Sequence, residues 1–158
     1  MKRVAILLLM ALLVNGCGSG RPTAQSASGG LWQAQLSDGV GSSSGFSFNT
    51  QFTVGSNGDL SISNFEFLND NPGSCFPING GTISGNMVLT QNMATNGVTG
   101  TMTFSVTSSS NTLSLTGNVT GTIVGSTLSD GMATGNWSLT GAGACSNATG
   151  PYTMKQAS

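Results

Sequence analysis

Apolar and polar residues alternate along most of the chain after residue 30. In the segment LWQAQLS the apolar residues are Trp32, Ala34 and Leu36, and in GFSFNTQFTV they recur at every second position with Thr50 in the same register. A period of two is typical of a β-strand with one buried face, whereas an amphipathic helix repeats every three to four residues. No segment shows the helical period, so the pattern predicts a chain built from strands.

The same alternation continues toward the C-terminus and is interrupted by short turns. The dipeptide Asn57-Gly58 supplies the positive φ that a tight hairpin needs. The apolar parity then flips between Ile62 and Phe65, which indicates a β-bulge near residues 63–64. After the first two strands, we expect strands over residues 60–67, 82–90, 98–107, 112–124, 132–139 and 152–155.

Eight or nine strands at intervals of about 10 to 15 residues predict an all-β fold made from a single antiparallel meander. A short pattern, hydroxyl–Gly–polar–apolar, recurs inside the strands, as at residues 99–102 and 134–137. Its spacing is too irregular for a solenoid of binding repeats. Glycines inside strands permit the sharp coiling that closes a barrel. We therefore favour a small up-and-down barrel, with a β-sandwich as the alternative.

The composition excludes one class of partner. Only 6% of the 158 residues are charged, against about 25% in a typical protein, and the chain has no histidine. Beyond Cys17 the only cations are Arg21 and Lys155, against five anions. A surface that binds nucleic acid needs clustered cations to neutralise phosphates. Nucleic acid is therefore not an expected partner.

The N-terminus has the layout of an export signal. Lys2 and Arg3 precede an unbroken apolar run over residues 4–14. As a helix, these 11 residues would reach roughly 16 Å, well short of the ~30 Å hydrocarbon core of a bilayer. The run is therefore interpreted as the hydrophobic region of a signal peptide.

The run ends in Val14-Asn15-Gly16-Cys17, which resembles the lipobox of bacterial lipoproteins: an aliphatic residue at −3, a small one at −1 and cysteine at +1. The resemblance implies cleavage between Gly16 and Cys17, a diacylglycerol on the Cys17 thiol and an acyl chain such as palmitate on its amino group. Asn15 departs from the usual Ala or Ser. No Asp follows Cys17 to retain the protein at the inner membrane, so the outer membrane of the cell envelope is the expected location. The alternative is a secretory signal with Cys17 in a disulfide.

The resulting organisation has three parts: a signal peptide over 1–16, a lipidated cysteine with a Gly/Ser-rich tether over 17–30, and a β domain over 31–158.

Cys75 and Cys145 remain as an even pair in an oxidising compartment, which favours a disulfide. It would close a loop of about 70 residues and contribute roughly 4 kcal/mol. A metal-binding or reactive thiol pair is the rival, but there is no histidine and no CxxC spacing.

The chain offers little for catalysis. Glu66 and Asp70 are a possible carboxylate pair of the glycosidase type, but Glu66 stands between Phe65 and Phe67 and is expected to face solvent. Asx-rich turns near Asp59 and Asp70 could offer oxygen ligands to calcium, but no EF-hand spacing is present. We predict no catalytic residue, no metal site, no cofactor and no enzyme activity.

Two functions remain. The first is a membrane-anchored envelope lipoprotein whose non-catalytic β domain has a structural or protein-interaction role. The second is a carrier of a small apolar ligand, with residues such as Phe48, Met87 and Phe104 lining a cavity. The layout is similar in architecture to lipocalin-like and avidin-like barrels, although no family motif supports that similarity. The expected partners are the membrane, through the N-terminal lipid, and either an envelope protein or a small apolar ligand.

Overall fold

The computed structural model describes residues 28–37, 46–68, 81–108, 110–125, 127–141 and 148–157. These residues form eight antiparallel strands and contain no helix. The all-β prediction is therefore confirmed, with eight strands from the expected eight or nine. In chain order the strands are β1 (Ser28–Leu36), β2 (Ser47–Val54), β3 (Leu60–Phe67), β4 (Thr82–Gln91), β5 (Gly97–Ser108), β6 (Asn111–Val124), β7 (Thr127–Thr140) and β8 (Ala148–Gln156).

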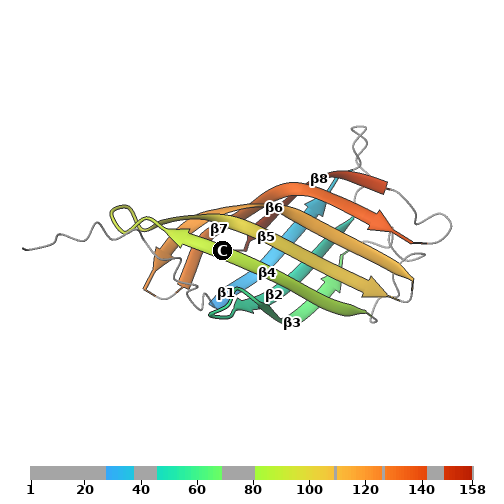
Figure 1. The fold of residues 1–158 in the computed structure, drawn as a ribbon, viewed down its shortest axis with the longest axis horizontal. Helices are drawn as coiled ribbons and strands as arrows, with labels where there is room; N and C mark the ends of the chain where they lie inside the picture. Colours follow the sequence, from blue (N-terminus) through green and yellow to red (C-terminus); the bar gives the residue numbers. More distant parts are fainter. Residues whose placement is uncertain are drawn as a thin grey trace, which may run out of the picture.

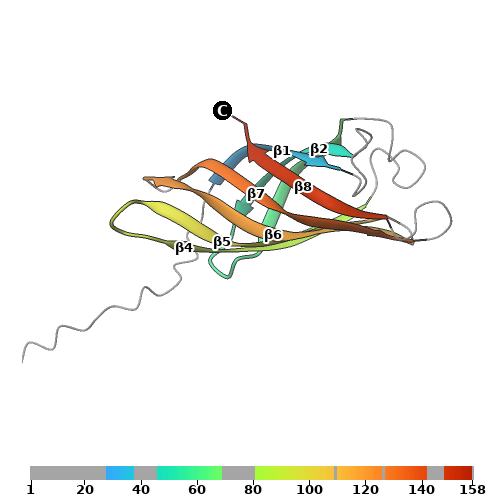
Figure 2. The same cartoon turned by 90° about the horizontal axis from the view of Figure 1, so that it is seen from above.

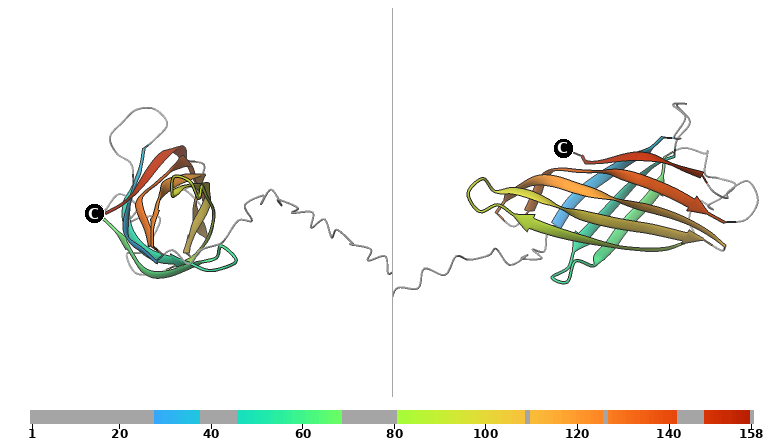
Figure 3. Two further views of the ribbon diagram at one scale, coloured as in Figure 1. Left: turned by 90° about the vertical axis from the view of Figure 1, so that its left-hand side faces the viewer. Right: turned by 45° about the horizontal axis from the view of Figure 1, so that its top comes forward.

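The strands form one nearly closed barrel (Figure 1). Their order in the sheet is β3-β2-β1-β8-β7-β6-β5-β4, so each strand pairs with the next one in the chain except β3 with β4, and β1 pairs with β8, as in the favoured up-and-down meander. The left panel of Figure 3 looks along the barrel and shows the strands arranged in a ring. The seam lies between β3 and β4. Among the described residues it is bridged where Asp59 lies opposite Asn86 and where the Met87 N–H donates to the Gly58 carbonyl at 2.8 Å.

The predicted bulge lies in β3. Gln51 of β2 pairs with Asn64 and Phe52 pairs with Ile62, which leaves Ser63 as the extra residue. At this bulge the Thr50 hydroxyl donates a hydrogen bond to the Asn64 carbonyl oxygen, at a distance of 3.1 Å between the two oxygen atoms. Thr50 is fully buried, so this bond satisfies a hydroxyl that would otherwise be costly to place in the core.

Three strands begin at least three residues earlier than the alternation indicates. β1 begins at Ser28, three residues before the expected domain boundary at residue 31, β7 begins at Thr127 instead of residue 132, and β8 begins at Ala148 instead of residue 152. In β7 the cause is a second bulge: Thr120 of β6 pairs with Met132, whereas Thr122 pairs with Ser129. Asp130 adopts a positive φ of 53° there. The bulge reverses the parity of the inward positions, which hides the strand from a period-two search.

Apolar side chains from opposite sides of the barrel meet in its interior. Phe48 of β2 stacks on Phe104 of β5 with ring centroids 5.5 Å apart, and Phe65 of β3 lies 6.0 Å from the same ring. Trp32 of β1 stacks on Phe52 at 5.4 Å. All but the half-buried Phe65 are essentially inaccessible to solvent. The core therefore lies inside the barrel, and aromatic contacts of this kind add to the stabilisation from burial alone.

Two paired glycines of β6 and β7 face the interior of the barrel. Gly117 and Gly135 are paired in register. A Cβ added to Gly135 would lie 2.1 Å from the Thr116 carbonyl oxygen, and one added to Gly117 would lie 2.2 Å from the Thr134 oxygen. The Tyr152 hydroxyl lies 2.7 Å from that second position, so its ring spans from β8 across Gly135 to Gly117. This arrangement supports the predicted structural role of the strand glycines.

The two ends of the barrel differ. Three short connections, β2–β3, β4–β5 and β6–β7, lie at one end together with the start of β1, which we call the hairpin end; the short β5–β6 connection lies at the other end. The strand ends that flank residues 38–45, 69–80 and 142–147 lie at the opposite end, called the loop end (Figure 2). Cys75 and Cys145 fall outside the described residues, so their disulfide stays a prediction. The described strand ends on either side of the two segments that contain them lie at the loop end.

We predict that Gly135→Ala destabilises the barrel by about 1–3 kcal/mol, because the added methyl group forces β6 and β7 apart. Urea denaturation followed by far-ultraviolet circular dichroism measures the change. Gly30→Ala in β1 is the matched control, since its Cβ would lie 3.9 Å from the nearest atom, Gln156 Nε2. Equal unfolding midpoints for the two variants would contradict the proposed close approach.

Candidate functional site

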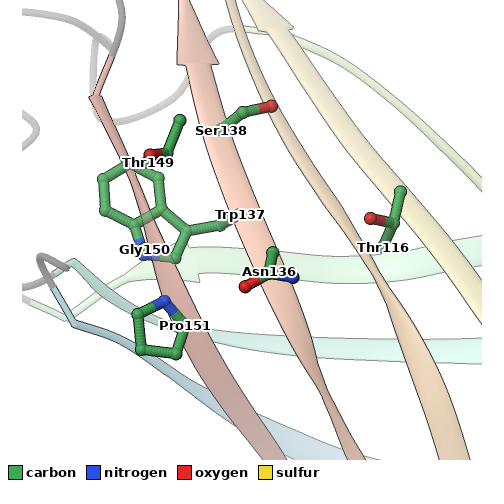
Figure 4. A pocket seen from close by; sticks show the side chains of 7 residues that line it. All are labelled: Thr116, Asn136, Trp137, Ser138, Thr149, Gly150 and Pro151. Atoms are coloured by element: carbon green, nitrogen blue, oxygen red, sulfur yellow. The ribbon is translucent and has the colours of Figure 1, made fainter.

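The outer face of the barrel has an open depression of about 500 Å³ over β6, β7 and β8 (Figure 4). It forms where Gly150 of β8, which lacks a side chain, pairs with Trp137 of β7. Pairs in register supply the polar lining: Thr116 beside Asn136, and Ser138 beside Thr149. These groups donate and accept hydrogen bonds but do not titrate near neutral pH. The depression can therefore hold a neutral polar group and cannot act as an acid or base.

Trp137 forms one wall of this depression but is held by the fold. Its Nε1 donates to the Ser37 carbonyl at 2.7 Å, and its ring meets Phe46 edge to face with centroids 5.5 Å apart. Only 3% of its surface is exposed. These contacts show that Trp137 is a packing residue.

A second depression of about 550 Å³ lies at the hairpin end, between Gly30, Val124, Asp130 and Gln156. The Gln156 amide is fully engaged: Nε2 donates to Leu128 O at 2.8 Å and Oε1 accepts from the Gly131 N–H at 3.1 Å. These two bonds tie β8 to the bulged part of β7. Asp130 contributes a single carboxylate, and the rest of the lining is neutral.

The interior holds two polar atoms that have no hydrogen-bond partner among the described residues, Trp32 Nε1 and the Tyr152 hydroxyl. The edge of the Trp32 ring lies against Gly131, where an added Cβ would be 2.3 Å from Cη2. Burial raises the pKa of Tyr152 to about 12, because the phenolate would have to exist in an apolar interior. An unpartnered buried donor costs about 1–3 kcal/mol, so both atoms mark places where a small polar group would be stabilised.

The alternation placed Trp32 on an inward position, but it did not single out either polar atom. An inward donor finds a hydrogen-bond partner only where an opposite strand places an acceptor close to it. The local sequence does not indicate which residues lie opposite. The apolar parity of β8, with Tyr152 and Met154 both buried, was the one local clue.

Of the described carboxylates, Glu66 and Asp59 are too far apart to act together. Glu66 is exposed on β3, while Phe65 and Phe67 beside it turn toward the core, as predicted. Asp59 lies seven positions earlier, roughly 20 Å along the strand, and a glycosidase pair needs about 5 to 9.5 Å. Asp70 lies outside the described residues. Within the described ranges no three His, Cys, Asp or Glu side chains gather closely enough to hold a metal ion.

The residues predicted for attachment, Gly16 and Cys17, also lie outside the described residues. In the described part of the chain, no helix has the length and apolar character needed to cross a membrane. No family model, curated protein or solved structure matches this chain.

We predict that Tyr152 titrates near pH 12 in the folded protein and near pH 10 in urea. It is the only tyrosine, so phenolate absorbance at 295 nm reports this group alone. Since the pKa is raised by folding, the stabilisation it reflects is complete below pH 10 and is lost as the pH rises through 12. Tyr152→Phe should abolish the signal and reduce the loss of stability between pH 10 and 12. A midpoint near 10 in the native protein would show that the hydroxyl is hydrated.

Proposed function

We propose that this protein is a lipid-anchored lipoprotein of the bacterial cell envelope, in which a non-catalytic β-barrel has a structural or protein-interaction role. The observation that carries the proposal is the N-terminal sequence: a cationic start, a short apolar run and the lipobox-like residues 14–17. Two or three acyl chains on Cys17 would anchor the protein firmly, whereas one chain binds only marginally.

The outer face of the barrel supports an interaction role. The four strands β4 to β7 contain a single charged residue, Asp130. Their outward positions form rows of hydroxyl and amide groups on neighbouring strands, about 4.8 Å apart. One row is Ser84, Ser105, Ser114 and Ser138, continued by Thr149 of β8, and another is Thr90, Thr99 and Thr120. Such a face is suited to a neutral partner that forms many hydrogen bonds, because it offers neither ionic steering nor charge repulsion.

Mass spectrometry of the membrane fraction tests the anchor. We expect a mature chain that begins at Cys17, carries a diacylglycerol and an acyl group, and lacks residues 1–16. Cys17→Ser should prevent both the modification and its retention with the membrane, while leaving the barrel folded. A wild-type protein found in the soluble fraction with an unmodified Cys17 would refute the proposal.

The alternative function is a carrier of a small ligand inside the barrel. The unpartnered Trp32 Nε1 and Tyr152 hydroxyl favour it, because a largely apolar ligand with one polar group could satisfy a buried donor there. The contact of Phe48 with Phe104 limits the space, since these rings from opposite walls already meet. A ligand would therefore lie on the Tyr152 side of that contact or displace a ring.

Native mass spectrometry of protein isolated from its own cells separates the two functions. The anchor-and-interaction proposal predicts a native mass equal to that of the lipidated polypeptide. A carrier would show an additional mass that is lost on denaturation and reduced in Tyr152→Phe. An additional mass of that kind would replace the first proposal with the second.

A further inference from the structure

Among the residues that the structure describes, exposed large apolar side chains concentrate toward the hairpin end. Met93, in the β4–β5 turn, is 81% exposed, and Val124, at the end of β6, is 65% exposed. Leu31, Val88 and Met132 are also exposed and lie in the halves of their strands nearer this end. At the loop end the described residues contain one such side chain, Leu68. Single exposed apolar residues are ordinary, but a group at one end of a molecule marks a contact surface.

The hairpins with the two most exposed residues are also those that project furthest. The β4–β5 and β6–β7 hairpins lie side by side at the left of Figures 1 and 2, and the β2–β3 hairpin with Asp59 is set back from them. The other described charges in this half are Asp130, near the start of β7, and Lys155, which pairs with Met132 across β7 and β8. Two acidic groups and one basic group give no electrostatic attraction to an anionic surface.

The length of chain before β1 brings this end close to the proposed anchor. Ser28 stands eleven positions after Cys17, and β1 starts at the hairpin end. A Gly/Ser-rich random coil of that length would have an average end-to-end distance of roughly 18 Å. The hairpin end is therefore held near the bilayer, at a high effective concentration at which even a weak contact is occupied.

We propose that the hairpin end rests on the bilayer surface through Met93 and Val124, and that the loop end faces away from the membrane. This inference rests on the proposed lipid anchor at Cys17. The contact is apolar: the two side chains enter the boundary between headgroups and acyl chains, and the neighbouring carboxylates stay in water. The anchor thus restricts the orientation of the barrel as well as its location, and it leaves the neutral outer face and the loop end accessible.

Methionine oxidation measures the contact with a native side chain. The lipidated protein is reconstituted in vesicles of phosphatidylethanolamine and phosphatidylglycerol, treated with hydrogen peroxide and mapped by mass spectrometry. We expect Met93 to oxidise at least about fivefold more slowly than in the unlipidated Cys17→Ser protein mixed with the same vesicles, because membrane contact excludes the oxidant. The matched control is Leu68→Met, whose side chain is 43% exposed in the wild type; its oxidation rate at the loop end should be the same in both proteins.

A second variant tests the chemistry of the contact. Val124→Asp places a charge at the expected contact and should restore fast oxidation of Met93 in the lipidated protein. Because Val124 is mostly exposed, the urea midpoint should not change. Raising the salt concentration should leave the protection intact, since screening weakens only ionic contacts.

Four outcomes would overturn the inference. Fast oxidation of Met93 in the lipidated protein would show that its side chain stays in water. If lipidation slowed oxidation of the methionine in Leu68→Met as much as that of Met93, the membrane contact would not be specific to the hairpin end. Slow oxidation of Met93 in the unlipidated protein would point to a second copy or a protein partner on this surface. Protection that survives Val124→Asp would place the contact elsewhere. The mass of the intact protein distinguishes these outcomes from failure of the proposed function. If Cys17 carries no lipid, the proposed anchor is wrong; if it carries lipid, only the proposed orientation is wrong.

Discussion

The close approach of β6 and β7 is the constraint on which the rest of the barrel depends. Gly117 and Gly135 face each other across these strands, and neither position has room for a side chain. Because both residues lack a side chain, the sheet can coil tightly and the Tyr152 ring can lie over Gly117 and Gly135. The same arrangement places a phenol hydroxyl in an apolar interior. Closure of the barrel, the raised pKa of Tyr152 and the lack of a partner for its hydroxyl therefore have a common origin.

Much of this fold could be predicted because a strand with one buried face alternates whatever its neighbours are. Phe48, Thr50 and Phe52 revealed β2 in this way, and the parity change around Ser63 revealed the bulge in β3. The start of β7 was missed because the positive φ at Asp130 breaks the alternation without any recognisable motif. The unpartnered atoms of Trp32 and Tyr152 were missed because satisfaction of a buried donor depends on contacts between residues distant in the sequence.

The molecule combines an apolar interior with an outer surface that is polar but almost free of charge. Most of its polar groups are the hydroxyls and amides of threonine, serine and asparagine, which lie in rows across neighbouring strands. Such a surface is insensitive to pH and salt over a wide range. For the proposed envelope lipoprotein, whose ionic conditions would follow the surroundings, that property would keep the proposed interaction surface constant.

The seam between β3 and β4 makes the barrel mechanically unequal around its circumference. Separating any other neighbouring pair breaks a complete ladder, whereas opening the seam breaks, among the described residues, the bridge at Asp59 and the hydrogen bond from Met87 to Gly58. Leu60 packs across this line onto Gly85, so apolar contact contributes to holding it shut. Fluctuations of the native state should therefore separate β3 from β4 before any other pair of strands. Solvent or a ligand would then reach the aromatic interior through the side of the barrel and not through its ends.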